Sequence, residues 1–317
     1  MSTLADVAAL SRVSKATASR ALSRPEMVSP DTVARVLDAA AKLGFEPNRA
    51  ARHLARGRSG IVALLVPTLD NSFFTPIIGG AQRRADDEGL QLTIAVHSLE
   101  TVGELGAVER LARQVDGFII AAPRGGDDLV LAAGSHKPTV LLDRELEGLT
   151  SVVADTASAF GGLVDRFIEE GHRRIAYIGG PGGSWQDRQR TAIVTETARD
   201  RAELTVLGPC PSTFAAGIGV AAAVRDSGAT AVVPYATAIG LGVQYALLAD
   251  PTFDRDIVVS SERSVVDTLG LVGVPAVDVD GDELGRAAAE LLLERIRDPD
   301  AEPTRTRLPV PVQWPGA

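Results

Sequence analysis

Four side chains suited to nucleic-acid contacts lie within six positions near the N-terminus: Lys15, Thr17, Ser19 and Arg20. Short hydroxyls reach phosphates, and lysine and arginine reach phosphates or the edges of guanine in the major groove. We expect these residues on the polar side of one helix, residues 15–22. The alternative is an ordinary three-helix bundle with a solvated basic face.

Three short helices are predicted to position these residues. Thr3 precedes an amphipathic stretch at residues 4–10, and Ser14 is placed to cap the helix at residues 15–22. Ser29, followed by Pro30 in the first helical position, opens a third helix that Gly44 ends. Two helices joined by a short turn predict a helix-turn-helix domain over residues 1–45.

The charge distribution agrees with this prediction. The 317 residues carry 41 acidic and 32 basic side chains, a net charge of -9 that by itself argues against a nucleic-acid partner. Residues 1–60 hold ten lysines and arginines against five acids, so this segment is +5 and the remainder is -14. A basic head on an acidic body is typical of an added nucleic-acid-binding module.

Residues that would support catalysis or metal binding are sparse. None of the four histidines forms a metal-binding pattern, and Cys210 is the only cysteine. The glycine-rich stretch at residues 179–183 is followed by Ser184-Trp185 in place of the Lys-Ser/Thr of a phosphate loop. We therefore expect no enzyme, metal or cofactor. With neither a signal peptide nor a membrane span expected, we predict a cytoplasmic protein, associated with the nucleoid when bound to DNA.

The rest of the chain alternates between strand-like and helix-like segments. An apolar run at residues 61–67 is followed by a helix at 74–88 and a strand at 90–96, and a second series of this kind begins near residue 157. Such alternation predicts parallel sheets with helices on both faces. Two successive series predict two lobes, with a ligand bound between them at the carboxyl ends of the strands.

The N-terminal segment resembles the DNA-binding head of the lactose/galactose repressor family. The resemblance has no gap and rests on residues 3–8 (TLADVA), 13–22 (VSKATASRAL), 28–29 (VS) and 43–54 (LGFEPNRAARHL). It implies base contacts by Lys15, Ala16 and Arg20. It also implies phosphate contacts by Thr3, Ser14, Thr17, Ser19, Ser29, Thr32 and Asn48.

The resemblance further implies a hinge helix within residues 46–58, which folds on the operator and enters the minor groove. Leu54 corresponds to the apolar wedge that kinks the DNA, and Ala51 lets two hinge helices approach closely. A charged linker is the alternative interpretation of this arginine-rich segment. In the turn between the first two predicted helices, Arg12 stands where many family members have glycine. If its backbone is left-handed, this conformation costs on the order of 1 kcal/mol of stability. Arg12 is also a candidate phosphate contact.

Residues 60–317 resemble the family's type I periplasmic-binding-protein-like core. The similarity rests on residues 60–67 (GIVALLVP), 71–74 (NSFF), 116–120 (DGFII), 140–144 (VLLDR), 171–180 (GHRRIAYIGG) and the helix from residue 284. It implies lobe 1 at about 60–155 and 279–305, and lobe 2 at about 156–278 and 306–317. The expected effector-binding residues are Asp70, Phe73, Phe74, Asp143, Arg190, Tyr235 and Glu262.

The cleft departs from the family pattern. Ala236-Thr237 stand where an Asn-Asp pair is usual, Glu262-Arg263 replace paired aspartates, and Ile193 replaces a glycine. Several groups that select sugar hydroxyls are therefore absent. Core packing is the alternative role for Phe73 and Phe74, and an exposed helix arginine is the alternative for Arg190.

Together these features predict a transcriptional regulator, most simply a repressor. It would bind a near-palindromic operator in double-stranded DNA as a homodimer, under control of a sugar or related polar metabolite. Two alternatives stay open. One is a constitutive repressor with a diverged cleft, and the other is a small-molecule-binding protein without specific operator recognition.

Overall fold

The computed structural model describes residues 2–23, 25–45, 58–250 and 257–315. By its internal contacts the chain divides into two compact units, Met1–Gly60 and Ile61–Ala317, here called the head and the body. The predicted hinge, with Asn48, Ala51 and Leu54, lies outside the described residues.

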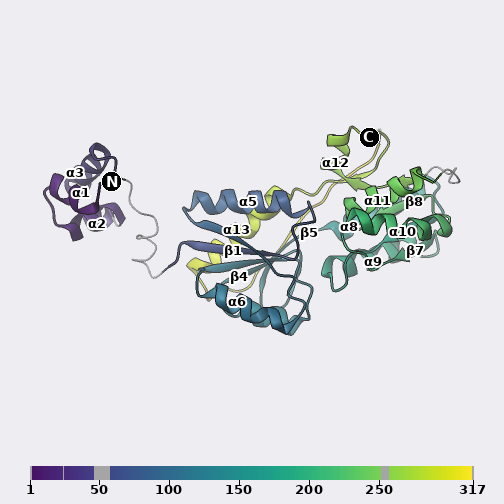
Figure 1. The fold of residues 1–317 in the computed structure, drawn as a ribbon, viewed down its shortest axis with the longest axis horizontal. Coiled ribbons are helices and arrows are strands. Elements are labelled where there is room, and N and C mark those ends of the chain that lie inside the picture. The colour runs from purple at the N-terminus through teal and green to yellow at the C-terminus, as the bar shows by residue number, and fades with distance from the viewer. Residues whose placement is uncertain (1, 24, 46–57, 251–256, 316–317) are drawn as a thin grey trace. The chain divides into compact units, whose positions relative to one another are not determined.

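In its described residues the head has three α-helices (Figure 1), which pack around a small apolar core. Helix α1 begins directly after Thr3, which forms a capping box with Asp6. Helix α3 begins at Pro30, where the missing N–H of proline costs no helical hydrogen bond. The helical bounds are α1 Leu4–Leu10, α2 Lys15–Ser23, a 3-10 turn Pro25–Met27 and α3 Pro30–Lys42. The buried core residues are Val7, Ala8, Ala18, Ala21, Val36, Ala39 and Ala40.

The turn between α1 and α2 contains a strained residue. Arg12 has φ +54°, a left-handed conformation at the position where the sequence departs from the usual glycine. The next residues reverse the chain, with the Val13 amide donating to the Ala8 carbonyl over 3.0 Å. Ser14 Oγ then accepts the Thr17 amide over 3.0 Å and caps α2. The serine cap and the left-handed residue together set the angle at which α2 leaves the turn.

The first lobe of the body is a parallel sheet between two layers of helices (Figure 1). Helices α5 and α13 contribute to the core on one face, and α6 and α7 to the core on the other. The six strands lie in the order β12-β5-β4-β3-β1-β2. Their bounds are β1 Ile61–Val66, β2 Gln91–Val96, β3 Gly117–Ala121, β4 Thr139–Leu142, β5 Thr150–Ala154 and β12 Arg305–Leu308. The helices are α5 Phe74–Asp87, a 3-10 turn Val102–Glu104, α6 Leu105–Ala112, α7 Asp127–Gly134 and α13 Gly281–Arg297.

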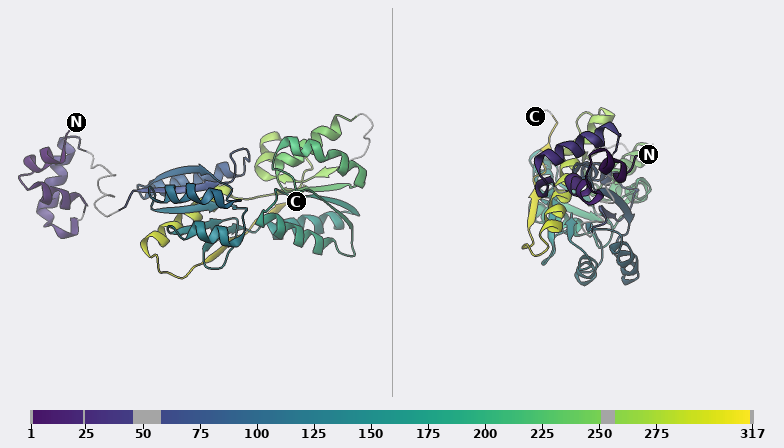
Figure 2. Two further views of the ribbon diagram at one scale, coloured as in Figure 1. Left: turned by 60° about the horizontal axis from the view of Figure 1, so that its bottom comes forward. Right: turned by 90° about the vertical axis from the view of Figure 1, so that its left-hand side faces the viewer.

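The second lobe repeats the layering on a four-stranded parallel sheet. In the left-hand view of Figure 2, the green helices α10 and α11 lie on one side of the sheet and the teal helices α8 and α9 on the other. The strand order is β7-β6-β8-β9. The elements are α8 Thr156–Glu169, β6 Arg174–Ile178, α9 Trp185–Ala198, β7 Glu203–Leu207, α10 Phe214–Ser227, β8 Ala231–Pro234, α11 Thr237–Leu248 and β9 Val258–Val259.

A third, three-stranded sheet joins residues on either side of α13. It contains β10 Ser261–Glu262, β11 Ala276–Val277 and β13 Val312–Gln313, with the short helix α12 Arg263–Leu269 between the first two strands. The sequence pattern did not predict this helix. The lobe boundary expected at about residue 305 falls too early, because β12 pairs with β5 through Leu308.

Residues 204–224 and 227–249 carry no charged side chains. The first stretch contains the end of β7 and most of α10, and the second contains β8 and α11. In the described ranges, no helix is both long and apolar enough to cross a bilayer.

Candidate functional site

The recognition residues expected in the head share one exposed side of α2. Lys15, Ala16 and Arg20 are all exposed, whereas Ala18 and Ala21 point into the core. This arrangement leaves two long cationic side chains and one methyl group available to a groove. It follows from helical spacing, since residues 15, 16, 19 and 20 lie away from the buried stripe.

The residues expected at phosphates cluster at helix starts. Thr3 precedes α1, Ser14 precedes α2, and Ser29 precedes α3 with its hydroxyl 3.0 Å from that of Thr32. Backbone N–H groups at a helix start favour anions, so these positions suit phosphates. Each hydroxyl also has a local structural role, because Thr3 bonds Asp6 and Ser14 bonds Thr17. Ser19 is exposed on α2 and Thr17 is half-buried.

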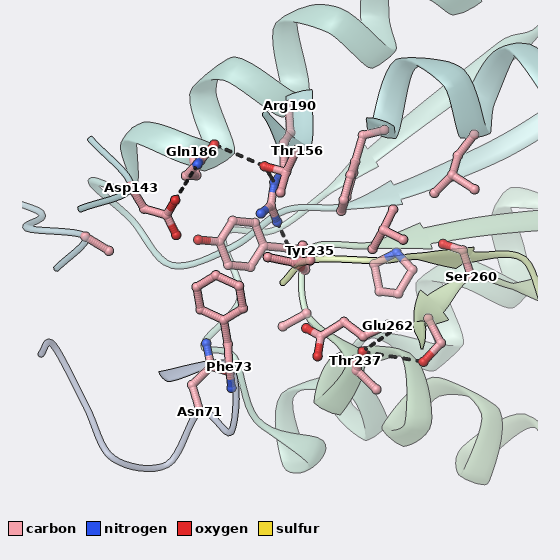
Figure 3. Close-up of a pocket in the computed structure, with 18 of the residues that line it drawn as sticks. Asn71, Phe73, Asp143, Thr156, Gln186, Arg190, Tyr235, Thr237, Ser260 and Glu262 are labelled. Atoms are coloured by element: carbon pink, nitrogen blue, oxygen red, sulfur yellow. Dashed lines mark hydrogen bonds between the residues drawn. The ribbon is translucent and has the colours of Figure 1, made fainter. Parts of the chain in front are cut away.

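The body contains a cavity between its two lobes (Figure 3), with a free volume of about 40 Å³. This is well below the range of small-molecule sites, roughly 300–1,000 Å³, so the cleft as it stands is nearly filled by its own side chains. Six expected effector residues line it: Phe73, Phe74, Asp143, Arg190, Tyr235 and Glu262. Asp70 is exposed and lines a neighbouring pocket at the mouth of the cleft instead.

Arg190, on α9, is the best-anchored cation of the cavity. Its Nε donates to Thr156 Oγ1 and its Nη1 donates to the Tyr235 carbonyl, both over 2.8 Å. The guanidinium carbon lies 4.4 Å from the ring centre of Phe160 and 4.6 Å from that of Tyr235. Arg190 is therefore buried and held by two hydrogen bonds and two cation–π contacts, not exposed on its helix.

Asp143 connects the lobes through Gln186. Its Oδ1 accepts a hydrogen bond from Gln186 Nε2 over 3.0 Å, joining the end of β4 to the start of α9. Gln186 in turn accepts the Thr156 hydroxyl over 3.1 Å. Burial raises the pKa of Asp143, although the Ala154 amide, Gln186 and Arg190 oppose the rise. This hydrogen-bonded series is the main polar link across the cavity.

Arg144, next to Asp143, supports the rim of the cleft. Its side chain is almost completely buried, and Nη1 donates to the carbonyls of Pro123 and Gly125 over 2.9 and 2.7 Å. Its Nη2 lies 2.6 Å from Asp127 Oδ1. Arg144 thus fixes the loop after β3 and does not line the cavity.

Glu262 and Tyr235 also line the cavity, and the pKa of each side chain is raised. Burial raises the pKa of Glu262, with Arg190 opposing the rise. Burial also raises the pKa of Tyr235, whose hydroxyl lies 3.0 Å from Ser184 Oγ. The Tyr235 ring packs against Gly180, where a Cβ would meet the ring at 2.6 Å. Glycine at 180 therefore makes room for the tyrosine ring.

The glycine-rich stretch after β6 has a structural role in the described structure. Gly183 has φ +77°, and a Cβ there would lie 2.4 Å from the carbonyl oxygen of Arg124 in lobe 1. Asp187 holds the same loop by accepting the Gly180 amide over 2.8 Å and the Tyr177 hydroxyl over 2.7 Å. The loop closes one side of the cleft and carries no phosphate-loop lysine.

Sequence reasoning missed several polar residues of the cavity wall. Asn71, Thr156, Gln186, Thr237, Ser260 and Ser261 all line it. Thr237 Oγ1 accepts the Glu262 backbone amide over 3.1 Å, and Asn71 Oδ1 accepts the Phe73 backbone amide over 3.2 Å. Their position at helix and strand ends was the available signal. Among the described residues, no group of three or more His, Cys, Asp or Glu side chains is placed to hold a metal ion.

Comparisons with known proteins agree with both units. Residues 3–48 match the family described as "Bacterial regulatory proteins, lacI family", and residues 164–314 match a "Periplasmic binding protein-like domain". The ribose operon repressor of Bacillus subtilis (strain 168) is 35% identical over 181 residues, 57% of this chain and 55% of that protein. The chain thus spans about half the length of the curated relatives it matches first. The maltose regulon regulatory protein MalI of Escherichia coli (strain K12) is 27% identical over 93% of this chain and 92% of its own.

Solved structures extend the likeness over nearly the whole chain. A complex of the transcriptional regulator CelR with cellobiose has a TM-score of 0.70 and 26% identity, covering 99% of this chain and 98% of its own. The lac repressor dimer bound to operator and the anti-inducer ONPF has a TM-score of 0.81 at 24% identity, covering 98% and 97%. The second likeness supports the fold.

Proposed function

This chain belongs to the lacI family of bacterial regulatory proteins, and on that premise we propose that it is a sequence-specific DNA-binding transcriptional regulator. The observation that carries the proposal is the exposed side of α2, where Lys15, Ala16 and Arg20 stand clear of the buried alanines. Arg20 is assigned to a guanine edge, and Ala16 to a thymine methyl group. The hydroxyls at the three helix starts orient the head on phosphates.

In this proposal, a ligand bound to the acidic body controls the affinity of the head for DNA. A small polar molecule bound in the cavity contacts both lobes, so it stabilises one arrangement of the Asp143–Gln186 link over another. The ligand can change the affinity for DNA only to the extent that it binds one of the two arrangements more tightly than the other. We assign no catalytic role to the chain and place it in the cytoplasm.

A homodimer is the proposed binding unit, because paired heads match a near-palindromic operator. The body offers an apolar surface on α10 and α11 for a second copy. Phe214 and Ile218 are 43% and 41% exposed, while Tyr245 and Leu248 are 60% and 87% exposed. Apolar side chains gathered in this way are typical of a protein interface.

A constitutive regulator is a second candidate, favoured by one specific observation. Tyr235 and Arg190 satisfy each other inside the cavity through the carbonyl hydrogen bond and the stacked ring. In this case the cleft is filled by its own side chains and operator affinity responds to no small molecule. Ligands that bind the body but leave operator affinity unchanged would favour this candidate.

The DNA-binding proposal is tested by selecting binding sites from random duplexes with the full chain. Anisotropy titrations then compare the wild type with Arg20→Ala and Leu54→Ala, using Arg113→Ala in the body as a charge-matched control for the arginine. We expect a near-palindromic consensus, and a loss of about fivefold to a hundredfold for Arg20→Ala at physiological salt. Equal operator affinities for the wild type and both head variants would refute the proposal.

A further inference from the structure

Among the charged side chains that line the cavity, Glu262 is the one for which the described residues provide no side-chain hydrogen bond or ion pair. Its amide bonds Thr237, but in the described ranges its carboxylate has no hydrogen bond or ion pair. The side chain is half-buried, and burial raises the pKa of its carboxyl group. A half-buried carboxylate without a side-chain partner is available to a ligand group.

The other polar groups of the cavity are mostly occupied by one another. Gln186 gives its amide to Asp143 and the Ala154 carbonyl, and Thr156 is shared between Gln186 and Arg190. The Tyr235 hydroxyl is bonded to Ser184. The carboxylate of Glu262 and Oδ2 of Asp143 still offer acceptor positions to a ligand.

The charged groups that line the cavity also favour a cationic ligand. Two carboxylates, Asp143 and Glu262, face one guanidinium, that of Arg190, so the ionised cavity has one excess negative charge. Arg190 does not neutralise Glu262 by direct contact, because its bonds go to Thr156 and the Tyr235 carbonyl. One added positive charge would balance the site.

A second crevice adjoins this side of the cavity. Phe73, Glu262, Val277 and Val279 line both spaces, so Glu262 stands where the two meet. Asp278, Asp280 and Asp282 also line the crevice, and Asp282 pairs with Arg83. Of the described lining residues Arg263 is basic, and it pairs with Asp267. An acidic approach with low-dielectric walls concentrates cations at the entrance.

We propose that the effector of the proposed regulator is a compact cationic molecule, whose protonated amino group is bound by Glu262 beside the ring of Phe73. This inference rests on the proposed function for the idea of an effector, and it names that effector's chemical class. The carboxylate supplies a charge-assisted hydrogen bond, and the half-buried phenyl ring supplies a cation–π face. Figure 3 shows Glu262 and Phe73 on the same side of the cavity.

Matched pairs of probes test the charge directly. Isothermal titration of the full chain compares glucosamine with glucose, and the diamine putrescine with the diol of the same length. We expect an amine to bind about tenfold to a hundredfold more tightly than its neutral partner. The isosteric substitution Glu262→Gln should abolish that preference, while Glu147→Gln, an exposed acid outside the cavity, should preserve it.

Melting temperatures of the wild type and Glu262→Gln provide a second test of the charge. Without ligand, Glu262→Gln should melt at a slightly higher temperature than the wild type, because it removes a half-buried charge that has no side-chain partner. With the bound amine the order should reverse, since only the wild type gains from binding.

Three results would overturn the proposal: neutral probes that bind as well as the amines, amine binding that survives in Glu262→Gln, or no binding by any amine. Operator affinity measured on the same preparations separates the two proposals. If the operator binds tightly and no amine does, the cationic effector is wrong and the DNA-binding function stands.

Discussion

Replacing Arg12 with glycine should stabilise the head. Arg12 has φ +54°, a conformation that costs a residue with a Cβ roughly 1–2 kcal/mol. Glycine removes that cost but gains conformational entropy in the unfolded chain, worth roughly 0.5–1 kcal/mol. The difference is a net stabilisation of about 0.5–1 kcal/mol, or roughly a twofold to fivefold change in the unfolding equilibrium of the head.

Hydrogen exchange on the full chain measures this effect within the head alone. The most protected amides of the core, such as Ser11, which donates to Val7 over 2.9 Å, should exchange about twofold to fivefold more slowly in Arg12→Gly. Arg12→Ala keeps the strained backbone without the charge and should show no such gain. Gly44 provides the reverse control, because it has φ +57° and open space around it, so Gly44→Ala should speed exchange.

The same variants separate strain from DNA contact. Arg12 is exposed. If its side chain neutralises a phosphate, Arg12→Gly and Arg12→Ala should both lower the slope of log affinity against log salt by about one. Unchanged or faster exchange in Arg12→Gly would refute the strain argument, whatever happens to DNA affinity.

Three further predictions concern the body. In Gly285→Ala, the new Cβ would lie 2.0 Å from the Ile77 carbonyl oxygen, so forcing α5 and α13 apart should cost about 1–3 kcal/mol in urea denaturation; an unchanged midpoint would count against that close approach. Glu104 is partly buried, which raises its pKa, but three backbone amides of the preceding turn outweigh burial and hold the pKa below its usual value. The stability that Glu104 contributes is present above its unfolded-state pKa and is lost as the pH falls through its folded-state pKa. Glu104→Gln should therefore lower the free energy of unfolding by about 1 kcal/mol at neutral pH and leave it unchanged in acid. A loss of stability that does not depend on pH would contradict this. Arg190→Lys loses the planar contact with Tyr235 and the paired hydrogen bonds, and calorimetry should show a loss of about 1–3 kcal/mol; a wild-type melting profile would sink this account of the cavity.

Features with local causes could be predicted from the sequence. Thr3 and Ser14 cap α1 and α2 through bonds that reach only three positions, Ser29 takes the N-cap position of α3 without such a bond, and helix α1 has the predicted bounds. The left-handed backbone of Arg12 had no such local signal and was raised only through the resemblance, because many family members have glycine at that position.

The cleft was predicted only in part, because its contacts join residues far apart in the chain. Asp143 and Tyr235, expected at the cleft from the family resemblance, both line the cavity, because the carboxyl ends of parallel strands meet at one edge. Gln186 gave no comparable signal, since its role depends on Asp143, 43 positions away. The two-residue strands β10 and β11 are defined by pairing with each other and not by a periodic pattern.

The central claim is tested most directly by one ratio measured on the full chain. Its dissociation constant for a selected operator is compared with that for a scrambled duplex of equal length, at the same physiological salt concentration. A sequence-specific regulator that reads bases with α2 should prefer the operator by about a thousandfold or more. A ratio near one would contradict the account, because the head would then bind phosphates without reading sequence.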